Sequence, residues 1–593
     1  MTDDTATDRL TELAKRRGFF FQSSEAYGGV SGFYVYGPEG ATLKENLEDA
    51  WRDRFVRREG HMEIEAPNVM PEPVFEASGH LDGFDDMIVE CPECGASHRA
   101  DHIVEDNTDI EEAESIAIDD IEDIIAENDL VCPSCGTDLA GEPVDDFNLM
   151  FETNIGPGSS SPGYLRPETA QGIFVEFPRL KEYARGQLPF GVAQVGAAYR
   201  NEISPRKGLV RLREFAQAEL EHFVDPEADE PDLESVEDVA VTLYSEARQD
   251  DDGGEPVEMT VGEAVEEGIV GSAWVGYYLG VAQGWYERIG IDMDRFRFRQ
   301  HRSGELAHYA ADCWDAEADT SPPGADPDWI EITGFAYRGD YDLTKHGEYA
   351  DDDFTIFKQY DDPITVERAT VDPDMSYLGP EFGGDAGAVA DALEALAERD
   401  RSAFEGDDVT VDVDGEEYTV PVEKTGFAVE EVTEAGEHVT PHVVEPSFGV
   451  DRLVYTVLAH SLTQDDAGES EADGDDEERT VLTLPPELAP TTVAVFPLMD
   501  KDGLGERAGE IAERLRRAGF EVAEDASGSI GRRYRRQDEV GTPYCVTVDY
   551  DTLDDDTVTI RDRDTTAQAR VPVDDLPGVV ADLRAGETTV GDR

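Results

Sequence analysis

Residues 39–59 carry apolar side chains at the spacing of an amphipathic helix. The stripe consists of Leu43, Leu47, Ala50, Trp51 and Phe55. Side chains three and four residues apart lie on one side of a helix, so this side is expected to pack against a core. Pro67 and Pro71 break the pattern that follows. The sequence therefore predicts a helix here, followed by an extended stretch.

The last hundred or so residues predict a compact α/β domain, which is an ordinary domain size. Leu504, Ala508, Ile511, Leu515 and Ala518 have helical spacing, and Gly519 suits the end of that helix. The predicted strands of this domain are residues 492–498, 520–523, 544–548, 557–562 and 567–573.

Residues 190–226 predict two strands joined by a loop at residues 204–208, where Pro205 and Gly208 favour a turn. Side chains alternate between the faces of a strand. One face of the second strand then carries Arg211, Arg213, Phe215, Gln217, Glu219 and Glu221. The other face carries Leu212, Ala216, Ala218 and Leu220, and Arg200 and Glu202 share a face of the first strand.

A buried sheet face does not carry cations and carboxylates unless something polar binds there. The predicted pair of strands is therefore a candidate binding surface. The alternative is an exposed antiparallel sheet whose charges form surface ion pairs.

The charge of the chain is extreme. It has 48 Lys and Arg against 136 Asp and Glu, a formal net charge of −88, yet 39% of its residues are hydrophobic, which is too many for a disordered acidic protein. Such a charge should repel nucleic acid. The acid is spread along the whole chain, as in proteins of salt-rich cytosols, where the Debye length at about 1 M salt is about 3 Å and screens that repulsion. We therefore interpret the chain as halophilic.

Six Cys in 593 residues exclude a disulfide scaffold. Cys91 and Cys94 form one CxxC pair and Cys132 and Cys135 another, each with Pro after the first Cys and Gly after the second. Four thiolates suit a closed tetrahedral Zn²⁺ site. We predict structural Zn²⁺ here, with disulfides as the weaker alternative. Cys313 and Cys545 are isolated and are expected to be small buried residues.

Several segments resemble known motifs. YRNEISPRKG followed by RLREF is similar to motif 2 of the class II aminoacyl-tRNA synthetases, EPSFGVDR at 445–452 to motif 3, and the helix from Glu39 to motif 1, a dimer interface in that family. The segments GYLRPETAQGIFVEF, FRQHRSGELAHYAADCWD and WIEITGFAYRGDYDL resemble the dimeric type of glycyl-tRNA synthetase, and the C-terminal domain resembles the class IIa anticodon-binding domain. The matches follow one another in order over nearly the whole chain.

The resemblance implies an ATP site. Arg200 would bridge the α-phosphate and the substrate carboxylate, a role that suits a planar guanidinium fork. Glu202 would accept from the adenine amino group, Phe215 would stack on adenine, and Arg452 would lie over the other face or near the γ-phosphate. Arg200 and Arg452 are the expected catalytic residues. The expected ATP-binding residues are Arg200, Asn201, Glu202, Val210, Arg211, Leu212, Arg213, Glu214, Phe215, Glu331, Ile332, Gly449, Val450, Asp451 and Arg452. Mg²⁺ is expected with ATP.

The resemblance also implies a glycine pocket, which must surround an ammonium group with acceptors and leave no space beyond Cα. The expected glycine-binding residues are Arg99, Glu168, Phe215, Gln217, Glu219, Glu445, Ser447 and Gly449. The alternative for each Glu is an ion pair with a nearby Arg. A pocket walled by charged groups relaxes little, so no editing domain is expected.

Residues 531–545 gather cations in an acidic chain. Arg532, Arg533, Arg535 and Arg536 surround Tyr534, and basic and aromatic side chains are typical of contact with RNA. We predict tRNA contact here. The alternative is a surface helix whose arginines pair with nearby acids.

The predicted fold class is α+β: a class II synthetase catalytic domain, an antiparallel sheet flanked by helices, with a four-cysteine insertion and a C-terminal α/β anticodon-binding domain. The expected domains are 1–90 with motif 1, 91–147 with the zinc-binding insertion, 148–461 with motifs 2 and 3, an acidic linker at 462–484, and 485–593 with the anticodon-binding domain. The charge-rich insert within 91–147 is expected to be helical.

The expected function is ligation of glycine to tRNA(Gly) through glycyl-adenylate, by a cytoplasmic homodimer that binds ATP, glycine and tRNA(Gly), with neither membrane nor DNA as partner. No apolar run of about 18 residues and no secretory signal is visible. Two alternatives stay open: a ligase of this class for another amino acid, and a catalytically inactive relative that only binds nucleic acid.

Overall fold

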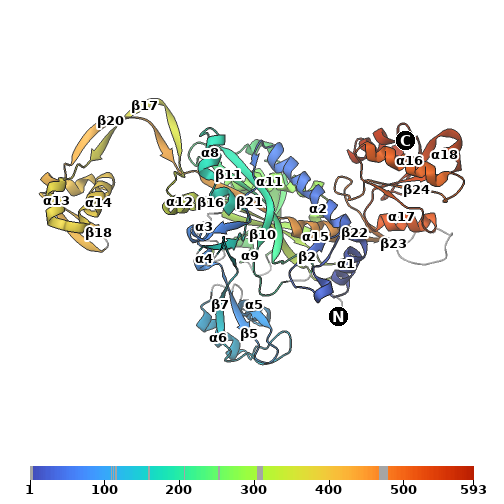
Figure 1. Cartoon of the computed structure of the whole chain (residues 1–593), viewed down its shortest axis with the longest axis horizontal. Coiled ribbons are helices and arrows are strands. Elements are labelled where there is room, and N and C mark those ends of the chain that lie inside the picture. The colour runs from blue at the N-terminus through green and yellow to red at the C-terminus, as the bar shows by residue number, and fades with distance from the viewer. Residues whose placement is uncertain are drawn as a thin grey trace. The chain divides into compact units, whose positions relative to one another are not determined.

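The computed structural model describes residues 4–108, 110, 113, 116–157, 161–205, 208–250, 254–303, 312–322, 324–413, 415–465 and 479–592 (Figure 1). The chain divides into two compact units. One comprises Met1–Ala184, Leu188–Phe354 and Thr440–Arg593, and the other Arg185–Gln187 and Thr355–Val439. No helix in the described residues has both the length and the apolar character that a membrane crossing requires.

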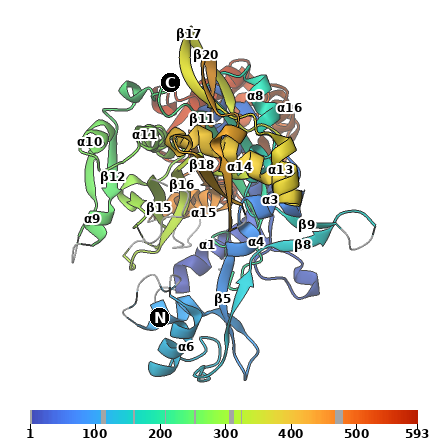
Figure 2. The ribbon, with the colours of Figure 1, turned by 90° about the vertical axis from the view of Figure 1, so that its left-hand side faces the viewer.

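A nine-stranded sheet forms the centre of the larger unit. Its strand order is β13 (Val257–Thr260), β12 (Ala240–Tyr244), β14 (Phe296–Gln300), β15 (Asp312–Asp319), β16 (Trp329–Gly339), β21 (His442–Gly449), β11 (Glu214–Val224), β10 (Phe190–Tyr199) and β3 (Met62–Glu63). Neighbouring strands are antiparallel except β12 with β14 and β10 with β3. Figure 2 shows β15 and β16 side by side.

Helices supply the hydrophobic core on one face of this sheet. They are α1 (Asp4–Arg17), α2 (Pro38–Trp51), α11 (Ala273–Arg288) and α15 (Val450–Ser461). A six-residue π-helix, Arg52–Arg57, continues α2, so the predicted helix at 39–59 is confirmed. The ring of Phe55 lies 4.7 Å from that of Phe448 on β21, and all five residues of the predicted stripe are buried.

Alternation along β11 separates this core from a polar face. Ala218 and Leu220 are fully buried in the core, whereas Gln217, Glu219 and Glu221 point to the opposite side, as predicted. The polar face is bordered by short helices and strands that precede or follow the sheet strands. These are α3 (Glu72–Ala77), α4 (His80–Gly83), α7 (Gln171–Phe174), α8 (Phe177–Tyr183) and α12 (Tyr341–Tyr349), with β4 (Val69–Pro71), β8 (Phe151–Asn154) and β9 (Pro162–Leu165).

The segment between Asp85 and Asn148 has a small core of its own. The strand order is β6 (Ser97–Arg99), β5 (Asp85–Glu90) and β7 (Val144–Asn148). Helices α5 (Ala100–Asn107) and α6 (Ile118–Glu127) pack against this sheet. The acidic insert was predicted to be helical, and these two helices agree with that prediction. Residues 109, 111–112 and 114–115 of that insert lie outside the described residues.

The C-terminal domain is confirmed as α/β. Its sheet has the order β25 (Val522–Glu524), β24 (Val493–Pro497), β26 (Tyr544–Val548), β27 (Thr557–Asp562) and β28 (Gln568–Pro572). The helices are α16 (Leu504–Arg517), α17 (Ile530–Asp538), α18 (Tyr550–Asp555) and α19 (Leu576–Arg584). Gly519 follows α16 with φ of 93°, the left-handed conformation expected of a glycine at a helix end.

The smaller unit is a long hairpin with a helical tip. β17 (Ile356–Thr370) pairs with β20 (Ala428–Val439), with a register shift between Gln359 and Ile364. The tip holds α13 (Met375–Phe382), α14 (Ala386–Arg399), β18 (Asp408–Val413) and β19 (Glu416–Pro421) around a separate apolar core.

The predicted acidic linker at 462–484 is wrong at both ends. Leu462–Asp465 and Arg479–Leu482 form an antiparallel pair, β22 and β23, because Val481 and Leu482 are buried. Residues 466–478, which carry most of the acid, lie outside the described residues.

Candidate functional site

The chain between β10 and β11 holds four charged residues of the predicted ATP site. β10 ends at Tyr199 and β11 begins at Glu214, so Arg200, Glu202, Arg211 and Arg213 lie in the connection. The prediction that they stand on strands is wrong. Irregular hydrogen bonds replace the ladder here: Arg213 Nε donates to the carbonyl of Glu202 at 3.0 Å, and Arg200 N donates to the carbonyl of Arg213 at 3.0 Å. Residues 206–207 of the predicted loop are outside the described residues.

Arg200 is held between two aromatic rings. Its guanidinium carbon lies 5.5 Å from the ring centre of Phe215 and 5.4 Å from that of Phe84, and Nε donates to the carbonyl of Pro167 at 3.2 Å. A guanidinium over an aromatic face is stabilised by the ring quadrupole and keeps its remaining donors for an anion. Phe84 is a contact that the sequence analysis missed.

A pocket opens at this connection. Its lining includes most of the predicted ATP-binding residues: Arg200, Glu202, Val210, Arg211, Leu212, Phe215, Glu331, Ile332, Gly449, Asp451 and Arg452, with Gln217 and Ser447 of the predicted glycine set. Asn201, Arg213, Glu214 and Val450 are not part of that lining.

Arg452, in the first turn of α15, closes one side of the pocket. It donates to the carbonyl of Val210 at 2.9 Å and to the carboxylate of Glu331 at 2.9 Å. Burial alone would raise the pKa of Glu331, but the charge and hydrogen bond of Arg452, together with the charge of Arg200, lower it. Glu331 is therefore an anion at neutral pH.

Asp451 anchors motif 3 to motif 2. One of its carboxylate oxygens accepts from the Ala216 amide at 2.6 Å and the other from the Tyr36 hydroxyl. Burial raises the pKa of Asp451. The contacts of Asp451 fix the start of α15 against β11, and so place Arg452.

Two rows of side chains cross the polar face of the sheet. Residues directly opposite in antiparallel strands share a face. One row runs through Asp315, Gly334, Ser447, Glu219 and Gln194. The next contains Cys313, Ala336 and Glu445, and the charge of Glu445 acts on Glu221 of β11. The sheet thereby brings together carboxylates that are far apart in the chain.

Glu219 is surrounded by donors. One oxygen accepts from Ser447 Oγ at 2.6 Å and from Gln217 Nε2 at 2.9 Å. The other accepts from the Ala170 amide at 2.6 Å and from the Thr169 hydroxyl. Burial and the nearby charge of Glu168 raise its pKa despite these bonds.

The remaining carboxylates of this cluster have partners that sequence reasoning missed. Glu445 accepts from Arg338 at 2.6 Å, and Arg338 also binds Asp342 through two hydrogen bonds of 2.8 and 2.9 Å. Arg338 and Asp342 are four residues apart within WIEITGFAYRGDYDL, a signal that could have found the pair. Glu168 accepts from Gln171 at 2.9 Å and lies 3.7 Å from His80. Burial alone would raise the pKa of Glu168, but His80, Arg338 and Gln171 lower it.

Glu221 has an unusual environment. It is fully buried, and among the described residues no donor reaches either carboxylate oxygen. Burial, reinforced by the negative charge of Glu445, raises its pKa well above the usual value. Burial therefore favours the neutral form of Glu221.

Arg99 is the last residue of β6 and lies among carboxylates. It binds Asp101 at 3.1 Å and Asp86 at 3.2 Å. Burial raises the pKa of Asp86, which also senses the charges of Glu202 and Arg211. This places Arg99 beside the residues around Glu202, with carboxylates already bound to its guanidinium.

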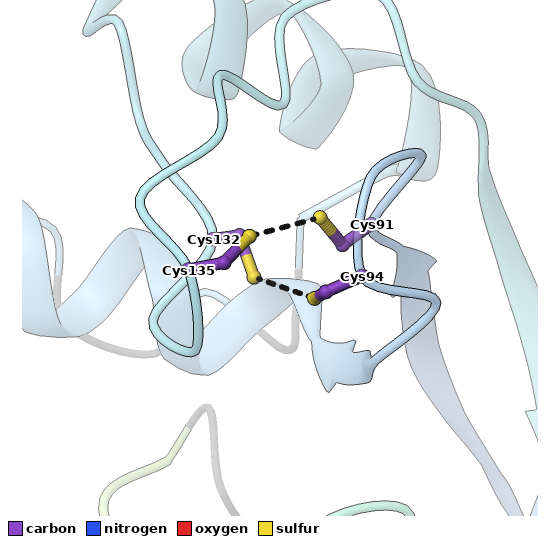
Figure 3. Close-up of side chains that lie close together, drawn as sticks. All are labelled: Cys91, Cys94, Cys132 and Cys135. Atoms are coloured by element: carbon purple, nitrogen blue, oxygen red, sulfur yellow. Dashed lines mark hydrogen bonds between the residues drawn. The ribbon is translucent and has the colours of Figure 1, made fainter.

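The four cysteines of the two CxxC pairs converge (Figure 3). Cys91 Sγ lies 3.5 Å from Cys135 Sγ, and Cys94 Sγ lies 3.8 Å from Cys132 Sγ. Thiolates at about 2.3 Å from a tetrahedral Zn²⁺ stand about 3.8 Å apart, so the four residues fit this ion. Cys91 and Cys132 are buried in the small core between Asp85 and Asn148.

The arginines of α17 divide into two groups. Arg533 is buried: it donates to the carbonyls of Ala526 and Gly528 at 2.9 Å and to that of Pro497. Its donors face the protein, which contradicts the prediction that it contacts RNA. Arg536 forms an ion pair of 2.5 Å with Asp525, and Tyr534 packs edge-on against Phe496. Arg532 is exposed.

Comparisons with known proteins agree with this architecture. Residues 160–251 match the tRNA synthetase class II core domain (G, H, P, S and T), and residues 492–583 match the anticodon binding domain. A prolyl-tRNA synthetase from Cryptosporidium parvum has the same fold, with a TM-score of 0.50 at 10% identity, covering 98% of this chain and 79% of that one. The chain therefore has the class II tRNA synthetase fold, as predicted.

Relatives that match nearly the whole chain show to which family within this fold class it belongs. A glycine–tRNA ligase from Methanothrix thermoacetophila is 49% identical over 98% of this chain and 97% of its own length. One from Methanothermobacter thermautotrophicus is 46% identical over 97% and 99%. The chain belongs to the glycine–tRNA ligase family.

Proposed function

We propose that this chain activates glycine with ATP to form glycyl-adenylate and pyrophosphate, then transfers glycine to the 3′ end of tRNA(Gly) and releases AMP. The supporting observation is a pocket lined by Arg200, Arg211 and Arg452, next to the buried carboxylate of Glu219 on the polar sheet face. Ser447 lines this pocket and donates a hydrogen bond to Glu219.

Activation joins two anions, so its main demand is charge neutralisation and alignment. Arg200 would bind the α-phosphate and the glycine carboxylate, because its stacking between Phe84 and Phe215 fixes the plane of its donors. Phe215 would then also support the adenine ring, Glu202 would accept from the adenine amino group, and Arg211 would hold the outer phosphates. Arg452 would bind the nucleotide from the opposite side.

Glycine is recognised through its ammonium group and its lack of a side chain. Glu168, Glu219 and Glu445 would surround the ammonium, with Gln217, Ser447 and Gly449 beside them. Every one of these carboxylates is fixed by a protein donor, so the pocket relaxes little around a larger substrate. Arg99 would support this site from the edge of the nucleotide pocket.

Metal ions have two proposed places. Mg²⁺ would accompany ATP and neutralise phosphate charge, and Glu331 offers it a carboxylate oxygen, the ligand type that Mg²⁺ prefers. Zn²⁺ would be held by Cys91, Cys94, Cys132 and Cys135 as a structural ion for the small core above them.

The anticodon end would bind tRNA through the exposed side of α17, with Arg532, Arg535 and Arg536. The chain would act as a homodimer in the cytoplasm, and the region around α2 would form the dimer contact.

Aminoacylation of isolated tRNA with radiolabelled glycine in molar potassium chloride tests the function. The wild type should charge tRNA with glycine. Arg200→Ala should lose charging while its tRNA affinity stays within about 2-fold, since Arg200 lies in the catalytic pocket. Loss of both together would contradict the role given to Arg200.

A further inference from the structure

Three potential metal ligands meet on the polar sheet face outside the roles given above. His301 directly follows β14, and Cys313 and Asp315 alternate on the neighbouring β15, so both side chains stand on one face. The His301 amide donates to the carbonyl of Cys313 at 3.0 Å, and His301 Nε2 lies 2.8 Å from a carboxylate oxygen of Asp315. One nitrogen, one sulfur and one oxygen atom of the three lie within 4.8 Å of one another.

The cluster borders the pocket already described. Asp315 stands opposite Gly334, which stands opposite Ser447. Since Gly334 has no side chain, nothing from β16 separates Asp315 from the pocket at this point. The negative charge of Glu331 acts on both Cys313 and Asp315.

We propose that His301, Cys313 and Asp315 form a second metal site that binds Zn²⁺ through Nε2, Sγ and one carboxylate oxygen. Imidazole, thiolate and carboxylate are all zinc ligands. Zinc sites that also bind a small molecule have three protein ligands and leave the fourth position open. The mixed set differs from the closed four-cysteine site, which has no open position.

Binding would replace protons by the ion. His301 Nε2 lies 2.8 Å from the Asp315 carboxylate and shares a proton with it, and the thiol of Cys313 carries another. Zn²⁺ would displace one proton from His301 Nε2 and one from Cys313 Sγ to solvent. The 2.8 Å contact between His301 and Asp315 would lengthen by about 0.5 Å, because ligands at 2.0–2.2 Å from a tetrahedral ion stand farther apart than hydrogen-bonded atoms.

Zinc content of the intact protein tests this proposal independently of the ligase activity. The protein is equilibrated with a small excess of Zn²⁺, gel-filtered and analysed for metal. We expect about two Zn²⁺ per chain in the wild type and about one in His301→Ala, Cys313→Ser and Asp315→Asn. Cys545→Ser, which removes a buried thiol elsewhere, should keep about two.

Co²⁺ gives a second readout that separates the two sites. In a variant with serine at all four cysteines of the closed site (Cys91→Ser, Cys94→Ser, Cys132→Ser and Cys135→Ser), bound Co²⁺ should retain a weak thiolate-to-cobalt charge-transfer band, and adding Cys313→Ser should remove it. Thermal unfolding identifies any variant that fails to fold. The metal content of the variants that do fold then decides whether the second site exists. About one Zn²⁺ per chain in the wild type, unchanged by His301→Ala and Cys313→Ser, would overturn the proposal. His301 and Asp315 would then form only an ion pair.

Discussion

Ser447 on β21 donates a 2.6 Å hydrogen bond to Glu219, which stands directly opposite on β11. The bond joins motif 3 to motif 2 across the sheet. Because Thr169 and Ala170 hold the second oxygen, the carboxylate has a fixed position before any substrate arrives. A fixed carboxylate binds an ammonium group without the entropic cost of ordering it first.

Glu219→Gln should weaken glycine binding. The amide would lose the charge and would turn an NH₂ group toward donors that now face a carboxylate oxygen. We expect the KM for glycine in ATP–pyrophosphate exchange to rise at least about 10-fold, in line with about 1.5–3 kcal/mol for a hydrogen bond to a charged group. Glu182→Gln, an exposed residue of α8, is the matched control and should keep the wild-type KM. An unchanged KM in Glu219→Gln would remove this residue from the pocket.

Glu221→Gln should alter how stability depends on pH. Burial raises the pKa of Glu221, so the folded chain keeps a proton that the unfolded chain loses above about pH 4.3. The stabilisation is complete below that pH and is lost as pH rises toward the folded-state pKa, by up to about 1.4 kcal/mol per pH unit.

Glutamine has no such proton. Denaturant midpoints from about pH 5 to about pH 7 should therefore fall less in Glu221→Gln than in the wild type. Two parallel curves would mean that Glu221 ionises normally in the fold.

Removal of zinc should loosen the segment between Asp85 and Asn148. Its core is small and includes Cys91 and Cys132, so it depends on the ion more than the central sheet does. Limited proteolysis of Cys94→Ser should cut within this segment, leaving fragments that resist further digestion. The wild type should show the same cuts only after a chelator is added. Identical cleavage of both proteins in the presence of zinc would contradict a structural ion.

Arg532 and Arg533 should behave differently although they are neighbours. Arg533→Ala leaves the buried carbonyl of Pro497, and those of Ala526 and Gly528, without this donor and should lower the unfolding midpoint of the C-terminal domain. Arg532→Ala should leave that midpoint and ATP–pyrophosphate exchange unchanged, and should raise the KM for tRNA several-fold. If Arg532→Ala does not change the KM for tRNA, α17 does not bind tRNA through this residue.

The regular elements were predicted well from the sequence, because the spacing of buried residues determines whether a segment forms a helix or a strand. The apolar stripe through Trp51 and Phe55, and the alternation through Ala218 and Leu220, both follow from a core on one side of the element. The end of β10 was not predictable in this way. Arg200 leaves the ladder because its partners, Pro167 and Phe84, come from other parts of the chain.

The same limit applies to charged residues. Motif resemblance identified Glu219 and Glu445, whose spacing within their motifs is local. It could not identify Arg338 as the partner of Glu445, or Glu221 as a carboxyl group without a donor among the described residues, because both facts depend on which strands become neighbours. The clustering of arginines in the sequence did not show which of them is buried. Arg533 binds backbone carbonyls, whereas Arg532 is exposed.

ATP–pyrophosphate exchange with a panel of amino acids tests the central claim most directly. The wild type in molar potassium chloride should catalyse exchange with glycine at least about 100-fold more efficiently than with alanine or serine, because an added methyl group meets walls of fixed carboxylates. Arg200→Ala should abolish the exchange. Exchange with serine but not with glycine would contradict the account.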